Sequence, residues 1–205
     1  MSGRENDRPG NDRPDARPDE LIEHGQVVLR RYRMDDLDAI VQTVTDSAAH
    51  LRPWMPWAAD YTRESAEEFL AGSIQGWDEG TVFNYAITIT TTDAGALAGG
   101  IGLMRRIGPG GLEIGYWVHR AYTRRGLATA ASAALVEQAF RLPGVDRVEI
   151  VHDELNVASS GIPRKLGFTE VERRPIELPA PEGSGVGVVW RLTRPALVLN
   201  PGLAR

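Results

Sequence analysis

Hydrophobic and polar positions alternate with the period of β-strands through much of the first half of the chain. Four such segments are predicted as strands: residues 27–33 (VVLRRYR), Val82–Thr90, Leu97–Met104 and Leu112–Val118. The last two are expected to form a hairpin around the turn Gly108–Gly111, and Thr91–Gly95 is expected to be another turn. Between the first two strands, helical spacing predicts one helix from Asp35 or Asp36 to about Thr45. A second is predicted from Thr62 or Ser65 through Trp77.

The second half of the chain changes to alternating helices and strands. The predicted elements, in chain order, are a helix over 126–141, a strand over 148–152, a helix over 158–166, and strands over 168–173 and 186–192. Pro143 and Gly144 end the first of these helices. Strands first and a βαβα segment afterwards favour a mixed α/β sheet.

The hydrophobic pattern also sets the expected domain limits. Residues 1–20 are rich in Pro, Asp and Arg and nearly free of large apolar side chains, so they cannot bury enough surface to offset the entropy of ordering. We expect a disordered tail over 1–25, one folded domain over 26–193 and a C-terminal tail over 194–205. A total of 205 residues fits one such domain.

Charge and cysteine content restrict the expected partners. The net charge is −5, and residues 1–25 carry −3 of it, so the folded part has no overall attraction for nucleic acid. No apolar run reaches the roughly 20 residues that span a bilayer, so no membrane partner is expected. The absence of Cys excludes disulfides, a thiolate metal site and a Cys nucleophile, and it suits the cytoplasm. Four dispersed His make no metal-ligand cluster, so no metal is expected.

The most informative segment is a basic turn between a strand and a helix, YWVHRAYTRRGLATA at 116–130. A helix N-terminus leaves backbone N–H groups unpaired and carries partial positive charge, so it accepts a phosphate group. Gly126 lets a ligand approach the backbone, Ala128 leaves the first turn unobstructed, and Arg124 and Arg125 add positive charge. The segment therefore predicts a phosphate site, with an ordinary strand-to-helix turn as the alternative.

Two spaced blocks resemble one family. TRRGLA at 123–128 resembles the acyl-coenzyme A loop Q/R-x-x-G-x-G/A of GCN5-related N-acetyltransferases (GNAT). Gly126 and Ala128 match, Thr123 stands where Gln or Arg is usual, and Arg124 stands where Gly is frequent. DELNVASSGIPRKLGF at 153–168 resembles the N-x-x-S…K-L-G-F segment of the ribosomal-protein (RimJ/RimL-like) branch. EIGYWV at 113–118 and LRPWMPW at 51–57 resemble further pieces of that branch, so the resemblance covers about residues 26–193.

The resemblance implies a fold and a cosubstrate. The implied fold is the α+β GNAT fold, in which a mixed, mostly antiparallel central sheet is flanked by helices. Strand 112–118 would splay from strand 148–152 to admit acetyl-CoA, with no metal. A backbone N–H near Trp117 or Val118 would stabilise the developing oxyanion. The residues implied in acetyl-CoA binding are Trp117, Val118, Arg124, Arg125, Gly126, Leu127, Ala128, Thr129, Asn156 and Ser159.

The sequence offers fewer candidates for catalysis than for acetyl-CoA binding. The general base must reach the amine, and Glu113 and Glu149 on neighbouring predicted strands are the candidates, although either could be a solvated strand residue. His152 is a weaker candidate, because a lone His is more often structural. Some family members carry a Tyr that serves as the general acid, three residues before the Leu of LGF. This chain has Pro163 at that position. The resemblance places Ser159 near the coenzyme sulfur, while a helix-capping role with Asn156 is the alternative.

The candidate residues for the acceptor site are aromatic. Trp54 and Trp57 lie on a Pro-bracketed loop that could form a wall of the site, and ordinary core packing is the alternative. Tyr116 is a further substrate-binding candidate. Because side chains alternate along a strand, at most one of Tyr116 and Trp117 is expected to point into the cleft.

The resemblance implies an N-acetyltransferase that transfers an acetyl group directly to a primary amine. The acceptor could be a protein N-terminal α-amine, a peptide or a small molecule, because the fold does not choose among them. One alternative is transfer from succinyl-CoA or another acyl-CoA, which would need an Arg such as Arg105, Arg106 or Arg120 at the acyl tail. Another is a catalytically silent acyl-CoA-binding regulatory module. A homodimer fits the branch, although the sequence carries no interface signal.

Overall fold

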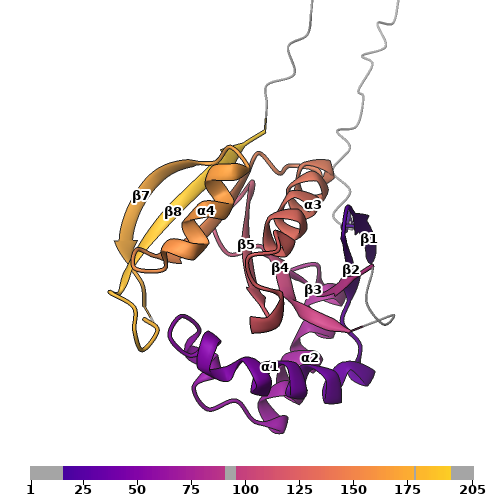
Figure 1. Cartoon of the computed structure of the whole chain (residues 1–205). Coiled ribbons are helices and arrows are strands. Elements are labelled where there is room, and N and C mark those ends of the chain that lie inside the picture. Colours follow the sequence, from indigo (N-terminus) through magenta and orange to yellow (C-terminus); the bar gives the residue numbers. More distant parts are fainter. Residues whose placement is uncertain (1–15, 91–95, 178, 195–205) are drawn as a thin grey trace, which may run out of the picture.

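The computed structural model describes residues 16–90, 96–177 and 179–194. Within these ranges eight strands form one sheet in the order β1-β2-β3-β4-β5-β6-β8-β7 (Figure 1). Their bounds are β1 Leu21–His24, β2 Val27–Arg31, β3 Val82–Ile89, β4 Leu97–Met104, β5 Gly111–Val118, β6 Arg147–Asp153, β7 Thr169–Pro175 and β8 Val186–Thr193. All neighbouring strands are antiparallel except β5 and β6, which are parallel.

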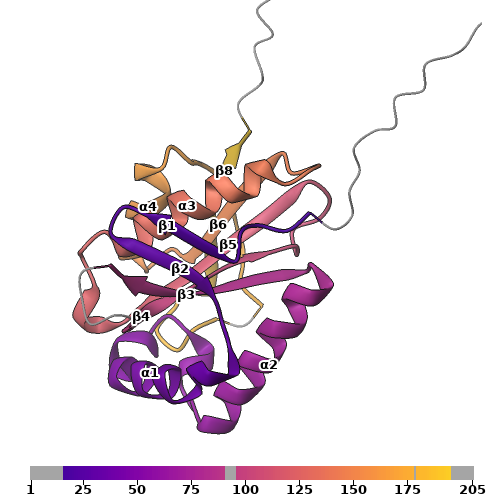
Figure 2. The same cartoon turned by 90° about the vertical axis from the view of Figure 1, so that its right-hand side faces the viewer.

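The helices cover both faces of this sheet. The α-helices are α1 Leu37–Leu51, α2 Arg63–Glu79, α3 Leu127–Arg141 and α4 Val157–Lys165, and short 3-10 turns are η1 Met34–Asp36, η2 Pro56–Ala58 and η3 Arg120–Tyr122. Helices α1 and α2 lie on one face, and α3 and α4 lie on the other (Figure 2). Among the described residues, no helix combines the length and apolar composition needed to cross a membrane.

The alternation along the strands builds a core on each face. On the α3 face, Leu112 and Ile114 of β5 pack with Leu127 and Leu135 of α3. On the α1–α2 face, Ala86 of β3 joins a second cluster, whose other buried members are Tyr32, Ile40, Val44, Leu51, Ala58, Ala66, Leu70 and Leu97. The predicted mixed α/β architecture is therefore confirmed.

The structure differs from the sequence prediction in one strand and one helix near the N-terminus. Strand β1 lies within residues 1–25, which the sequence assigned to a tail, and it pairs with β2 through the turn at Gly25, whose φ of 59° is left-handed. Its four residues, LIEH, occupy the sheet edge, so they carry too little apolar pattern to predict a strand. Helix α1 runs on to Leu51 rather than ending near Thr45. The predicted turn Thr91–Gly95 and the predicted disorder of 1–15 and of 195–205 lie outside the described residues.

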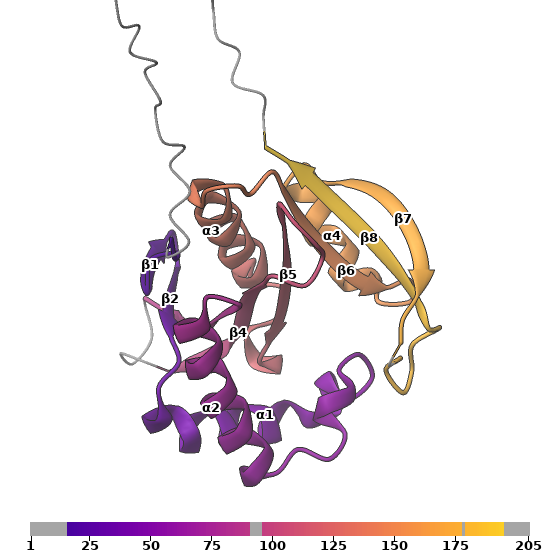
Figure 3. The same cartoon turned by 180° about the vertical axis from the view of Figure 1, so that it is seen from behind.

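One irregularity positions the functional site. The parallel pairing of β5 with β6 runs from Gly111 and Arg147 to Ile114 and Ile150, and then stops. Strand β5 continues to Val118 and β6 to Asp153. The two strands therefore diverge in their last residues (Figure 3), which confirms the predicted splay.

Gly99 of β4 packs closely against the backbone of β5 beside this opening. A Cβ atom on Gly99 would overlap the Trp117 carbonyl oxygen and stand 3.0 Å from the Val118 Cα. We expect Gly99→Ala to lower the free energy of unfolding by about 2 kcal/mol, because backbone atoms must move apart. The matched control is Gly72→Ala in α2, where nothing lies within 4 Å and stability should rise by about 0.5–1 kcal/mol. Chemical denaturation measures both; equal stability of the two variants would contradict this packing.

Candidate functional site

Two cavities meet at the open end of β5. The first, of about 660 Å³, lies between β5, the start of α3 and α4, and we call it the helix chamber; Arg124, Ala128 and Lys165 are among its lining residues. The second, of about 490 Å³, lies over β4 and β5, and we call it the sheet chamber; Gly100 and Glu113 are among its lining residues. The residues that line both chambers are Trp54, Met55, Tyr116, Trp117, Asn156 and Ser159.

The helix chamber is bordered by the predicted phosphate turn. Arg124 has a φ of 61° and Gly126 a φ of 80°, so two left-handed residues bring the chain sharply into α3. The first intrahelical hydrogen bond runs from Ala130 N–H to Gly126 O at 3.0 Å. The N–H groups of 127–129 therefore have no partner within the helix, and they point out of its N-terminus. Gln26 donates to Arg125 O at 2.8 Å and braces the turn.

The individual turn residues differ in position. Arg124, Gly126, Ala128 and Thr129 border the helix chamber. The Leu127 side chain belongs to the core and only its backbone is at the turn, since the residue is 1% exposed. The exposed Arg125 guanidinium lies over the Tyr122 ring at 5.4 Å, beside the chamber.

The first turn of α4 faces this loop across the chamber. Asn156 caps α4, because its Oδ1 accepts the Ser159 N–H at 3.3 Å. The Tyr116 hydroxyl donates to the Ser159 carbonyl at 3.3 Å, and burial raises the pKa of Tyr116 to about 12. The capping role is thus present, and Ser159 also borders both chambers. Pro163 is buried within α4, so the position of the usual Tyr offers no hydroxyl.

The divergence of the strands frees one backbone donor at the junction of the chambers. The His119 N–H donates to Ala98 O at 2.8 Å, on the β4 side. Since successive N–H groups of a strand point to opposite sides, the Val118 N–H points away from β4 and into the opening. The sequence offered Trp117 and Val118 as positions for an oxyanion donor. The Val118 N–H points into the opening, whereas the Trp117 N–H points toward β4.

The two candidate bases occupy neighbouring register positions in different surroundings. Glu113 and Glu149 are directly paired across β5 and β6. Glu113 borders the sheet chamber and forms an ion pair with Arg106. Glu149 is 3% exposed, borders neither chamber, and accepts two hydrogen bonds from Arg191, at 2.8 and 2.5 Å. The geometry therefore favours Glu113 over Glu149.

His152 borders the sheet chamber, but both of its ring nitrogens are occupied. Nδ1 lies 2.8 Å from the Asp153 carbonyl oxygen, which can only accept, so Nδ1 carries the proton. Nε2 then accepts the Trp190 indole N–H at 2.9 Å. Both ring nitrogens of His152 are thus occupied within the described residues, which favours a structural role over that of a base.

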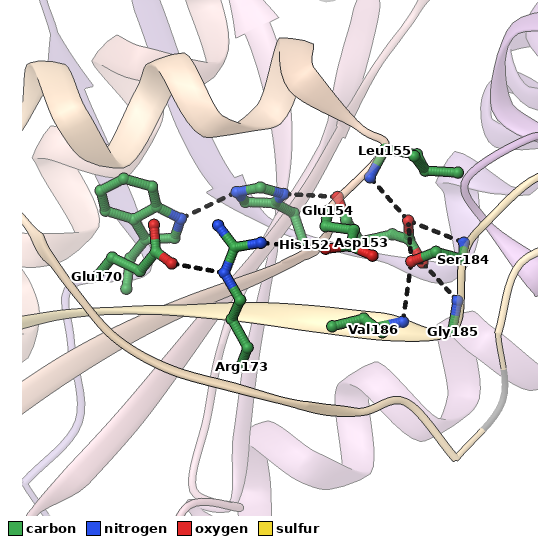
Figure 4. A network of polar contacts seen from close by, with 10 residues as sticks. His152, Asp153, Glu154, Leu155, Glu170, Arg173, Ser184, Gly185 and Val186 are labelled. Carbon is green, nitrogen blue, oxygen red and sulfur yellow. Dashed lines mark hydrogen bonds and ion pairs between the residues drawn. The ribbon is translucent and has the colours of Figure 1, made fainter.

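Asp153 fixes the β7–β8 loop beside the sheet chamber (Figure 4). Its carboxylate accepts the backbone N–H groups of Leu155, Ser184 and Gly185 at 3.0–3.1 Å, and also the Ser184 hydroxyl. Burial opposes ionisation, but these hydrogen bonds outweigh it and hold the pKa of Asp153 below its usual value. Ile176 and Ala180 of the same loop border the sheet chamber.

This loop also contacts the loop that follows α1. The Glu182 N–H donates to Pro53 O at 3.3 Å, which joins the two loops at the side of the sheet chamber (Figure 3). Trp54 and Trp57 come shortly after Pro53 in the loop that follows α1, and both border the sheet chamber. Trp57 is 43% exposed, so it is not a core residue.

Tyr116 and Trp117 both border the two chambers, although their side chains alternate in direction as expected for a strand. Their side chains do lie on opposite faces: Tyr116 packs against the α3 core and Trp117 against the α1–α2 core. Because β5 has no strand partner on its β6 side beyond Ile114, cavities border both faces, and each residue lines both chambers.

Several lining residues escaped sequence reasoning. Lys165 of the helix chamber stands within the KLGF block and was therefore available as a basic candidate. Tyr32, Asn84 and Ile176 of the sheet chamber carry no local signal, since tertiary packing alone brings them together. Among the described residues, no group of three or more His, Cys, Asp or Glu could hold a metal ion.

Comparisons with known proteins agree with this geometry. Residues 26–169 match the family model described as acetyltransferase (GNAT) domain. A protein of Bacillus subtilis strain 168, YdaF, named as a candidate ribosomal N-acetyltransferase, is 25% identical over 146 residues, which are 70% of this chain and 78% of that protein.

Solved structures share the fold. RimL, a ribosomal L7/L12 α-N-protein acetyltransferase in complex with coenzyme A, superposes with a TM-score of 0.76 at 20% identity, covering 85% of this chain and 98% of RimL. The microcin C7 self-immunity acetyltransferase MccE, in complex with acetyl-CoA and AMP, gives 0.75 at 15% identity, covering 85% and 99%. Mycobacterium smegmatis RimJ gives 0.74 at 22% identity, covering 86% and 88%.

The Asp153 network predicts a pH-dependent contribution to stability. Since the folded pKa lies below the unfolded value of about 3.9, the contribution is fully present above that pH and is lost as the pH falls through the folded pKa. We expect Asp153→Asn to lower the free energy of unfolding at pH 7 by about 2 kcal/mol and to flatten its acid dependence. Urea unfolding between pH 2.5 and 7 measures this. Glu182→Gln, an exposed change in the same loop, is the control; equal losses in both variants would refute the role of the carboxylate.

Proposed function

The chain belongs to the acetyltransferase (GNAT) domain family, and from that premise we propose that it transfers the acetyl group of acetyl-CoA directly to a primary amine. The observation that carries the proposal is the meeting of the helix chamber and the sheet chamber at the open end of β5. A donor entering from one side and an acceptor entering from the other would meet beside Ser159 and the Val118 N–H.

The helix chamber fits the phosphates and the thiol arm of the coenzyme. The unpaired N–H groups of 127–129 and the side chains of Arg124 and Lys165 supply donors and positive charge for a pyrophosphate. The Asn156 amide nitrogen has no partner among the described residues, so it is available to the amides of the arm. The neighbouring strand ends leave room for that arm between β5 and β6.

At the junction, the residues of this chain position the reacting groups. The Val118 N–H would donate to the thioester carbonyl oxygen, where negative charge develops. The Ser159 hydroxyl would donate to the departing sulfur, and the bond from Tyr116 to the Ser159 carbonyl fixes the backbone that carries it. With Pro163 at the position of the usual Tyr, Ser159 and Tyr116 are the hydroxyl-bearing residues that line both chambers, and the Tyr116 proton is donated to the Ser159 carbonyl.

Glu113 is the group to which we assign removal of the amine proton. It lies five residues before Val118 along β5, roughly 16 Å at the rise of a strand, so the proton would reach it through water. Arg106 fixes the orientation of its carboxylate. Glu149 holds Arg191 and has a structural role in this proposal.

Acetyl transfer is favoured over transfer of an acidic acyl group. Among Arg105, Arg106 and Arg120, only Arg106 borders the sheet chamber, and its charge is paired with Glu113. A succinyl carboxylate would then lack a free cation. The presence of Ser159 and the directed Val118 N–H at the junction, with Glu113 along the sheet chamber, supports an enzyme rather than a silent binding module. The names of YdaF and RimL support a protein α-amine as acceptor.

The phosphate turn predicts where coenzyme binding can be abolished. Gly126→Glu places a negative side chain at the start of α3, and we expect affinity for coenzyme A to fall at least 100-fold by charge repulsion and steric conflict. The control is Gly144→Glu, which imposes the same left-handed strain, φ 70°, just beyond the other end of α3 with nothing within 4 Å. Calorimetric titration of both variants with coenzyme A is the measurement. Equal affinities would show that the turn is not the binding site.

The two glutamates predict opposite kinetic behaviour. Glu113→Gln should lower kcat by roughly 100-fold and leave the KM for acetyl-CoA within about twofold. Glu149→Gln should leave kcat nearly unchanged and lower the melting temperature, because Arg191 loses its partner. Thiol release over a pH series, with thermal unfolding beside it, measures both. An unchanged kcat in Glu113→Gln would exclude it as the base.

A further inference from the structure

A side chain from the β1 edge of the sheet holds the phosphate turn. Gln26 follows Gly25 in the turn between β1 and β2, and its amide N–H donates to the Arg125 carbonyl oxygen at 2.8 Å. Within the described ranges, this is the one hydrogen bond that residues 121–125 form with any residue beyond the turn itself. The Gln26 backbone is fixed as well, because the Thr90 N–H donates to its carbonyl oxygen at 3.3 Å. The phosphate turn is therefore attached to the sheet through Gln26.

The turn needs this support because local preferences do not fix its conformation. Arg124, with a φ of 61°, is the one residue other than glycine that has a positive φ in the described part of the chain. A side chain in that region costs free energy, and the conformation persists only where surrounding contacts hold it. Gly126 has a φ of 80°, and glycine adopts either sign of φ with similar ease. The peptide between Arg125 and Gly126 is therefore not held by its own chain.

Gln26 holds this peptide in one orientation. No peptide bond among the described residues is cis, and in a trans peptide the C=O and N–H groups point in opposite directions. Since the Arg125 carbonyl faces Gln26, the Gly126 N–H points away from Gln26. That N–H has no backbone partner in the described residues. A rotated peptide would exchange the two directions and would present an acceptor where a phosphate needs a donor.

The helix chamber lies on the side of the turn that Gln26 does not occupy. Gly126 and Arg124 are lining residues of that chamber, whereas Gln26 borders neither chamber. The Gln26 side chain is exposed, and it contacts the turn from outside. Any effect of Gln26 on a ligand in the chamber is therefore transmitted through the peptide that it holds.

We propose that Gln26 is a positioning residue for the coenzyme. By holding the peptide between Arg125 and Gly126, it directs the Gly126 N–H to the pyrophosphate, beside the N–H groups of 127–129. This inference rests on the proposed function, because it requires the coenzyme in the helix chamber. The affinity for ligands that carry a pyrophosphate then depends on a residue about 100 positions earlier in the chain, at the edge of the sheet.

The test uses Gln26→Met, which keeps a neutral side chain of similar length and removes the donor. Three probes share the thiol arm: coenzyme A, dephospho-coenzyme A, which keeps the pyrophosphate but lacks the 3′-phosphate, and pantetheine, which has no phosphate. The affinities for coenzyme A and dephospho-coenzyme A should fall alike by about fivefold, the size expected for one hydrogen bond, and that for pantetheine should change less than about twofold. Titration calorimetry measures the first two probes, and ligand-observed NMR measures the weaker pantetheine.

The matched control is Gln75→Met. Gln75 is also exposed, its amide N–H donates to Glu79 at 2.6 Å within α2, and it borders neither chamber. Its replacement removes a comparable hydrogen bond and should leave all three affinities unchanged. Because Gln26 is exposed, Gln26→Met should melt at nearly the temperature of the parent protein, and thermal unfolding checks this.

The outcomes separate the role of Gln26 from the proposed function. If the parent protein binds coenzyme A and Gln26→Met binds it as tightly, or if Gln26→Met weakens coenzyme A and pantetheine by the same factor, the role of Gln26 is overturned and the acetyltransferase proposal stands. If the parent protein does not bind coenzyme A, both proposals fall. A loss confined to the two pyrophosphate probes, with Gln75→Met unchanged, supports the role of Gln26.

Discussion

The site depends on where the parallel pairing of β5 and β6 ends. Up to Ile114 and Ile150 the two strands satisfy each other's backbone groups, and beyond that point they separate within an otherwise continuous sheet. Backbone N–H groups at such a point need partners from elsewhere. The separation directs the Val118 N–H into open space and lets cavities border both faces of β5. A change that closed these strands would remove the donor, the junction of the chambers and the route between them at once.

Charged side chains around the opening have distinct roles because tertiary neighbours differ. Glu113 and Glu149 stand side by side in the sheet, yet Arg191 occupies one carboxylate and the other borders a chamber with Arg106. Asp153 and His152 are adjacent in sequence, and both serve the architecture. The Asp153 carboxylate fixes the β7–β8 loop, while His152 bridges its own strand and Trp190 (Figure 4).

The shared fold and the individual acceptor site belong to different parts of the chain. Solved acetyltransferases with quite different named substrates superpose over most of their length at 15–22% identity. The sheet chamber is bordered by the loop after α1 and by the β7–β8 loop, which are joined by the bond from Glu182 to Pro53. On the proposed function, selection among amines is therefore expected to reside in these loops.

Local patterns in the sequence were sufficient for most strands and helices, for the mixed sheet, and for the turn at Gly126, because each depends on periodicity, small residues or cap residues close together in the chain. They did not reveal β1, whose four edge residues bury little. Local patterns also could not distinguish Glu113 from Glu149 as the candidate base, and they kept His152 as a candidate. The side chains that bind these three residues, Arg106, Arg191 and Trp190, lie 7, 42 and 38 residues away in sequence. Only the tertiary structure decides which carboxylate faces a cavity, which imidazole is occupied and which buried hydroxyls, those of Tyr32, Tyr61 and Ser132, have no partner among the described residues. Those properties arise from long-range packing, which no local pattern encodes.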